Sequence, residues 1–110
     1  MRCESLKQLY EVISKKLTSY KIVLNENYLI IENSMSHVIK IVFNCGFFDV
    51  YIDDTYYHDV DGFDIEESLE SIMTNWILFK NNSAHILSPK DYDRVIKKDK
   101  NAHVFKFTNL

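Results

Sequence analysis

The short connections in the N-terminal half of the chain constrain its fold most. Four segments with strand-like patterns follow one another there, and only two to four residues separate each from the next. A parallel crossover needs about a dozen residues, whereas antiparallel neighbours can be joined by a tight turn. The sequence therefore predicts sequential antiparallel strands at residues 20–25, 28–32, 37–43 and 47–53.

Two segments with helical periodicity flank these strands in the sequence, one before them and one after. Residues 4–17 place their apolar side chains on one face of an amphipathic helix. The same pattern at residues 64–77 predicts a second helix, and Asp64 with Glu67 resembles a capping box at its start. The polar residues 81–83 are expected to end this helix.

The last third of the chain contains three further short elements. Residues 84–87 have the pattern of a short strand. Ser88 and Pro89 match an N-cap followed by the first helical position, which predicts a third helix through about Lys98. Residues 103–108 alternate between apolar and polar side chains and predict a closing strand.

Together these elements predict an α+β protein that forms a single domain over residues 1–110. Strands and helices do not alternate along the chain, which disfavours a parallel doubly wound sheet. We expect an antiparallel sheet of about four to six strands. The N-terminal helix and the second amphipathic helix should pack on one of its faces, with a short third helix near the C-terminus.

The charges are distributed unevenly along the chain. Residues 41–79 contain nine Asp and Glu but no Lys or Arg, whereas residues 80–110 contain seven Lys and Arg against three acids. A helix N-terminus accounts for Asp64, Glu66 and Glu67. The other acids repel one another, so they predict a patch that a basic surface or a cation neutralises. A solvated acidic face is the alternative interpretation.

Aromatic side chains are interleaved with these acids, so the patch has the composition of a protein-binding surface. Tyrosine suits such a surface because it buries a large area at low entropic cost and keeps a polar end. The candidate partner-binding residues are Asp53, Asp54, Tyr56, Tyr57, Asp59, Asp61, Glu66 and Glu70.

The sequence carries no local signature of a metal, cofactor or catalytic site. The acids between residues 59 and 70 have EF-hand spacing in part, but Asp64 stands where the calcium loop needs Gly. The four histidines show no zinc-binding spacing, and no nucleophile-elbow, phosphate-loop or dinucleotide-binding pattern occurs. We therefore expect no metal, no cofactor, no small-molecule ligand and no enzymatic activity.

The expected compartment is the cytoplasm. The apolar runs are far shorter than the roughly 20 residues of a membrane span, and no signal-peptide pattern is present. The two cysteines, Cys3 and Cys45, are widely separated and are expected to be free thiols in a reducing environment. A membrane is therefore not an expected partner.

In style the chain resembles the small immunity proteins that neutralise bacterial contact-dependent and other polymorphic toxins. It is short, acidic, rich in Tyr and Asn and poor in Gly, and it lacks catalytic motifs. The resemblance covers the whole chain. It implies a tight, specific complex with a basic toxin domain, often a nuclease, whose active site or adjoining surface is blocked. The acidic groups would then face the Lys and Arg that a nuclease uses to bind phosphate.

Two other functions remain open. A phage-encoded inhibitor of a host defence nuclease would use the same carboxylates in place of DNA phosphates. A small nucleic-acid-binding or regulatory module would instead act through the basic C-terminal segment. Asp91, Asp93 and Asp99 are interspersed with those basic residues and oppose phosphate binding, so nucleic acid is not the expected partner.

Overall fold

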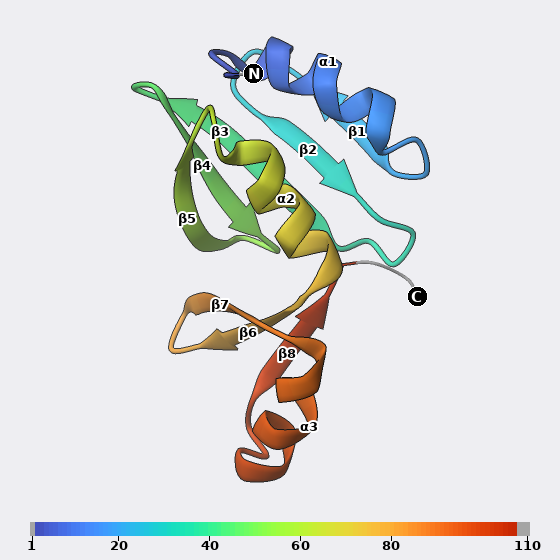
Figure 1. Cartoon of the computed structure of the whole chain (residues 1–110), viewed down its shortest axis with the longest axis vertical. Coiled ribbons are helices and arrows are strands. Elements are labelled where there is room, and N and C mark those ends of the chain that lie inside the picture. Colours follow the sequence, from blue (N-terminus) through green and yellow to red (C-terminus); the bar gives the residue numbers. More distant parts are fainter. Residues whose placement is uncertain (1, 108–110) are drawn as a thin grey trace.

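The computed structural model describes residues 2–107, which form three helices and two antiparallel sheets (Figure 1). This confirms the predicted α+β class. None of the helices in these residues is long and apolar enough to cross a membrane. The elements in chain order are α1 (Leu6–Lys16), β1 (Lys21–Leu24), β2 (Leu29–Glu32), β3 (Val38–Asn44), β4 (Phe47–Ile52), β5 (Thr55–Asp61), α2 (Ile65–Thr74), β6 (Trp76–Lys80), β7 (Ser83–Leu87), α3 (Pro89–Lys98) and β8 (His103–Lys106).

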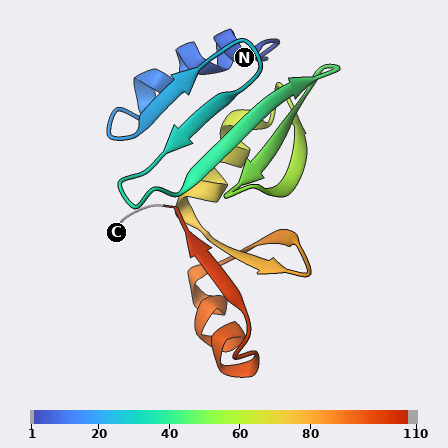
Figure 2. The same cartoon turned by 180° about the vertical axis from the view of Figure 1, so that it is seen from behind.

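The larger sheet is a meander of five strands in the order β1-β2-β3-β4-β5. Short connections join its first four strands, as the sequence predicts. In the first turn, the Asn25 side chain accepts hydrogen bonds from the backbone N–H groups of Asn27 and Tyr28, both at 2.9 Å. Helices α1 and α2 lie on the same face of this sheet, and Figure 2 shows the opposite face with its strands in view (Figures 1 and 2).

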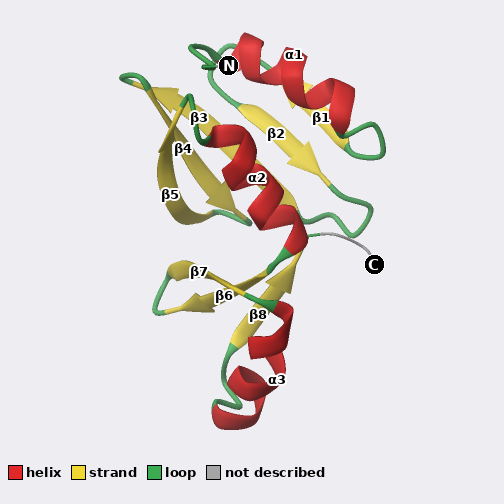
Figure 3. Ribbon diagram, in the orientation of Figure 1, coloured by secondary structure: helices red, strands yellow, loops and turns green. Residues whose placement is uncertain are grey.

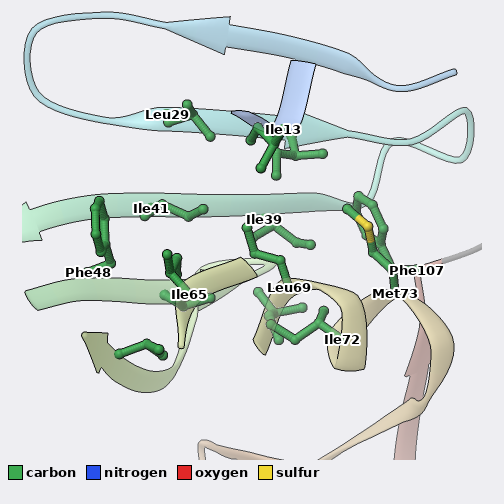
Figure 4. Close-up of a cluster of buried hydrophobic side chains, with 14 of the residues drawn as sticks. Ile13, Leu29, Ile39, Ile41, Phe48, Ile65, Leu69, Ile72, Met73 and Phe107 are labelled. Carbon is green, nitrogen blue, oxygen red and sulfur yellow. The ribbon is translucent and has the colours of Figure 1, made fainter. Parts of the chain in front are cut away.

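The main core lies between this sheet and its two helices (Figure 4). The strand register places Ile31 opposite Ile39 and Ile41 opposite Val50, and all four side chains are fully buried. Alternate residues face the other side of the sheet, which explains the period of two in the sequence. Helix α2 covers the core with Ile65, Leu69, Ile72 and Met73.

The second sheet has the order β7-β6-β8, and its central strand was expected to be helical. The helix predicted for residues 64–77 ends at Thr74, because Asn75 is extended, with φ −113° and ψ 169°. Residues 76–80 then form β6, which pairs with a strand on each side. Their aromatic and β-branched side chains suit a sheet, and pairing with distant segments overrides the helical period.

No element is predicted between residue 53 and the helix that begins at residue 64, but the structure has a strand there. Residues 55–61 form β5, paired antiparallel with β4. The two strands are joined by Asp53 and Asp54, whose φ angles are 47° and 66°. Positive φ at both positions is typical of the two-residue turns in β-hairpins, and Asp adopts it more readily than most residues.

The predicted capping box at the start of α2 is wrong. Asp64 has a helical backbone, and its side chain makes no cap hydrogen bond. Instead the carboxylate of Asp61 accepts hydrogen bonds from the backbone N–H groups of Phe63, at 3.0 Å, and Asp64, at 2.9 Å. Gly62 stands in this turn because a Cβ there would collide with the carbonyl oxygen of Cys3.

The remaining C-terminal elements match the prediction. Helix α3 begins at Pro89, directly after Ser88, and ends at Lys98. Its Tyr92 ring stacks on Trp76 of β6, with a centroid distance of 4.5 Å. Strand β8 closes the second sheet, and residue 108, the last of the predicted strand, lies outside the described residues.

Asn33 links the end of β8 to the β2–β3 turn. Its side chain is almost completely buried. Its Oδ1 accepts hydrogen bonds from the backbone N–H groups of Met35 and His37, at 3.0 and 2.9 Å, while its Nδ2 donates to the carbonyl of Phe107. The Phe107 ring, which is fully buried, stacks on Tyr20 at 5.3 Å and belongs to the core cluster in Figure 4. The two sheets are thus joined by apolar packing around one satisfied polar side chain.

We expect Asn33→Ala to lower the free energy of unfolding by about 2–4 kcal/mol, because it leaves a buried carbonyl and two N–H groups without their partner. Urea denaturation of the wild type and the variant measures this difference. Asn44→Ala, at the exposed end of β3, is the control and should change stability by less than about 0.5 kcal/mol. Equal effects of the two substitutions would contradict the structural role of Asn33.

Candidate functional site

The outer face of the five-stranded sheet, on the side opposite α1 and α2, carries the most distinctive group of side chains. Here we use "outer face" for this surface where it crosses β3, β4 and β5. Neighbours across these strands are paired by register, so Tyr51 lies opposite Tyr56 and Asp49 lies opposite Asp59. Their chain neighbours Phe48, Val50 and Val60 are buried in the core, which fixes the outward direction of these side chains.

Aromatic rings form a row across the outer face. The Tyr51 and Tyr56 rings meet edge to face at a centroid distance of 5.4 Å. The ammonium of Lys40 lies 5.9 Å from the Tyr51 ring and 5.1 Å from the Tyr28 ring. A cation over aromatic faces is attracted by their electron density. The row therefore already holds one cation, and Tyr56, which is 46% exposed, extends it to the edge of the sheet.

Two carboxylates face each other beside this row. Asp49 and Asp59 are direct cross-strand partners, which places their Cβ atoms about 4.5–5.5 Å apart. Within residues 2–107 neither forms an ion pair with a Lys or Arg side chain, and Asp59 approaches only the His58 imidazole, at 3.6 Å. The pKa of the Tyr56 phenol is raised, mainly by partial desolvation and to a smaller extent by the negative charges of Asp59 and Asp49. The charge here is thus negative and only weakly compensated.

The acidic surface continues around the edge of the sheet to α2. A depression of about 520 Å³ lies there, and no Lys or Arg occurs among its described lining residues. Exposed Phe47 forms one wall. Its carboxylates come from Asp59, Asp61, Asp64 and Glu67.

Of the eight predicted site residues, Tyr56 and Asp59 lie on the outer face, and Asp61 lies at the end of β5 beside them. Asp61 also holds the turn into α2, as described above. Tyr57 lies at an irregularity in the β4–β5 register and packs partly against the core, where burial raises the pKa of its phenol. It is therefore less accessible than its neighbour Tyr56.

Asp53 and Asp54 lie at the opposite end of β5, in the turn that joins it to β4. The Asp53 carboxylate accepts a hydrogen bond from the backbone N–H of Val38 at 2.8 Å, and its other oxygen lies 2.8 Å from Nδ1 of His37. These contacts fasten the turn to the start of β3. Asp54 is exposed beside it.

The structure separates Glu66 and Glu70 from the other six residues. Both lie on α2, beside the groove between α1 and α2, on the helix-covered side of the sheet. The carboxylate of Glu66 forms an ion pair with Lys16 of α1 at 3.0 Å. Crossing from β5 to α2 moves the chain to the other face, so neighbouring acids in the sequence face different directions.

Three residues of the outer face were not among the predicted site residues, namely Phe47, Asp49 and Tyr51. The alternation of residues 47–53 does carry a signal for them, because it places these three on the wet face of a strand. What the sequence lacks is the pairing of Asp49 with Asp59, which becomes visible only once β5 is known to be a strand.

Side chains that could bind a metal ion are not clustered in the part of the chain that the structure describes. Among residues 2–107, no group of three or more His, Cys, Asp or Glu side chains is arranged to hold a metal ion.

Comparisons of the chain with models of protein families, with curated proteins and with solved structures give no match. The outer face offers what a basic protein surface requires, which is exposed aromatic area with carboxylates beside it.

Charge reversal should divide the acids of this region into two kinds. Asp53→Lys and Asp61→Lys should each lower the free energy of unfolding by about 1–2 kcal/mol, because each carboxylate accepts backbone hydrogen bonds. Asp59→Lys should preserve or raise stability, since it replaces repulsion with attraction to Asp49. Thermal and urea denaturation of the three variants test this division.

Asp53→Asn is the matched control for the turn. Asparagine tolerates a positive φ and can still accept the hydrogen bond from Val38, so this variant should lose much less stability than Asp53→Lys. If Asp59→Lys were as destabilising as Asp53→Lys, the outer-face carboxylate would have to be assigned a structural role.

Proposed function

We propose that this chain is a non-enzymatic binding protein that neutralises a basic partner protein through the outer face. By its resemblance to immunity proteins, the partner is a toxin domain, and a nuclease fits best. The observation that carries this proposal is the direct opposition of Asp49 and Asp59 beside the exposed Tyr56 ring, on a sheet face without a covering helix in residues 2–107.

This arrangement is unfavourable for the isolated protein. Like charges directly opposite each other across a sheet are destabilising, and so is exposed aromatic surface in water. An arginine or lysine of a partner relieves both costs, because it can bridge the two carboxylates and lie against the tyrosine rings. The contact between Lys40 and Tyr51 shows the second of these interactions within the molecule itself.

The position at a sheet edge also suits a blocking protein. Tyr56, Asp59 and exposed Phe47 are carried by paired strands over a packed core, so little order is lost when a rigid partner binds. A nuclease presents Lys and Arg at its phosphate-binding surface, and negative charge around the outer face would speed the approach of such a surface. An inhibitor of a defence nuclease would act through the same contacts.

The test is capture of the partner from lysate of the source organism, at low and high salt, with variants that keep the fold. The wild type and the control Glu26→Lys, which changes an exposed acid in the β1–β2 turn, should retain one stoichiometric basic protein. Asp59→Lys should lose it, and Tyr56→Ser should retain less. The captured protein is then assayed for nuclease activity with and without the chain.

Two results would contradict the proposal. Retention of the same protein by Asp59→Lys would show that the outer face is not the interface. Recovery of nucleic acid that is released at high salt would instead indicate that the molecule acts through the basic C-terminal segment, because phosphate contacts weaken steeply with salt.

The repulsion itself is measurable without a partner. Asp49→Asn and Asp59→Asn should each raise the free energy of unfolding by about 0.2–1 kcal/mol, and the double variant should gain less than the sum of the two. The gain should shrink at 1 M salt, where charges are screened beyond about 3 Å. A loss of stability in either single variant would mean that the two carboxylates support the fold.

A further inference from the structure

A groove separates α1 from α2 on the helix-covered side of the sheet, and its volume is about 680 Å³. The two helices have 11 and 10 residues, which corresponds to about three turns or 15 Å each. In Figure 1 they run in roughly the same direction across the sheet. The apolar side chains that line the groove are Ile13, Leu17, Tyr20, Phe63, Leu69 and Met73.

The charges beside the groove are unbalanced. Three carboxylates line it, and all belong to α2: Glu66, Glu67 and Glu70. The only Lys or Arg among its described lining residues is Lys16 of α1, which is paired with Glu66 at 3.0 Å. Glu67 and Glu70 form no ion pair with a basic side chain within residues 2–107. The α2 side of the groove therefore keeps an excess of negative charge.

One end of the groove exposes a large aromatic side chain. Phe63 precedes α2 and is 65% exposed. The guanidinium carbon of Arg2 lies 5.2 Å from its ring centroid, so this ring too has a cation beside it. An exposed aromatic ring that borders an apolar groove is a common anchor in protein interfaces.

We propose that this groove is a second docking site, and that its occupant is a short amphipathic helix of a partner protein, with aliphatic side chains on one side and Lys or Arg on the other. A groove with an apolar lining and carboxylates along its α2 side is complementary to an amphipathic helix that carries basic residues beside its apolar face. The aliphatic side would face Leu17, Tyr20 and Phe63, which are at least partly exposed, and the basic side would face Glu67 and Glu70. The ion pair between Lys16 and Glu66 shows that a carboxylate on this side of α2 pairs with a cation.

This inference does not depend on the proposed function. The groove lies on the face of the five-stranded sheet opposite to the outer face, and Phe47, Tyr56 and Asp59 do not line it. Variants of the outer face can therefore remove one interaction and keep the other.

The experiment uses a fluorescently labelled 12-residue helical peptide of Leu and Lys, with the Leu residues on one face, titrated with the full chain and followed by anisotropy. Saturable binding by the wild type is expected. A peptide of the same composition with scrambled order, and one with Glu in place of Lys, should bind at least about tenfold more weakly. No saturable binding, or equal binding of the scrambled peptide, would overturn the proposal.

Variants locate the site. Glu66→Lys combined with Glu70→Lys should weaken the Leu/Lys peptide at least about tenfold, and Phe63→Ser should weaken it severalfold. All three positions have a side chain that is at least partly exposed, so the fold should survive, and thermal midpoints check this.

Two matched controls complete the test. Glu11→Lys combined with Glu26→Lys makes the same change in net charge at exposed positions outside the groove, and Phe47→Ser removes an exposed Phe from the outer face. Both should bind the peptide within about twofold of the wild type. If either control weakened binding as much as the groove variants, the groove would not be the site.

Discussion

The buried side chain of Asn33 holds together the two sheets on which the surfaces of this molecule depend. Its Oδ1 shapes the β2–β3 turn, and its Nδ2 binds the carbonyl of Phe107 just after β8. Because the group is buried, water cannot replace these hydrogen bonds, and their loss costs more than at the surface. The Phe107 ring can then stack on Tyr20 within the apolar cluster that both sheets share. One satisfied polar side chain thus ties the residue after β8 to the β2–β3 turn, while pairing with β6 positions β8 itself.

With the second sheet fixed in this way, the five-stranded sheet has two unlike faces. Helices α1 and α2 cover one of them (Figure 3), and Figure 2 shows the strands of the other. The acids of residues 41–79 follow one another without an intervening Lys or Arg. In the structure, however, the chain crosses from the outer face at Asp59 to the helix-covered face at Glu66. A single run of negative charge therefore forms two surfaces. One is a flat face with tyrosine rings, and the other is a groove with an apolar lining.

The sequence predicts the parts of this fold that local pattern controls. The β-branched residues of segment 37–43, the alternation of residues 47–53 and the short connections suffice for the first four strands of the meander, and Ser88 with Pro89 suffices for α3. It does not predict β6, because residues 76–79 are apolar at every position and fit a helix as well as a strand; only their pairing with β7 and β8 decides. Strand β5 was missed since the turn Asp53-Asp54 lacks the Gly that marks most hairpins.

The same limit applies to the candidate site. The sequence identifies Tyr56 as an aromatic and Asp59 as an acidic member of the candidate site, but the roles of Asp53 and Asp61 depend on backbone N–H groups that the fold brings to them. A carboxylate that holds a turn and one without such a role look alike in a sequence. Geometry separates them, because the first accepts hydrogen bonds from the backbone and the second faces another carboxylate.

The opposition of Asp49 and Asp59 cannot be relieved by a small adjustment of the fold. Their register is set by Phe48, Val50 and Val60, which are buried on the other side of the same strands. A slip of either strand by one residue would bring its carboxylate into the core and expose its apolar side chains. A change of sequence, salt or a cation from a partner would reduce the repulsion without such a slip. A wet strand face accommodates many kinds of polar side chain, so the strand pattern alone does not account for two opposed carboxylates.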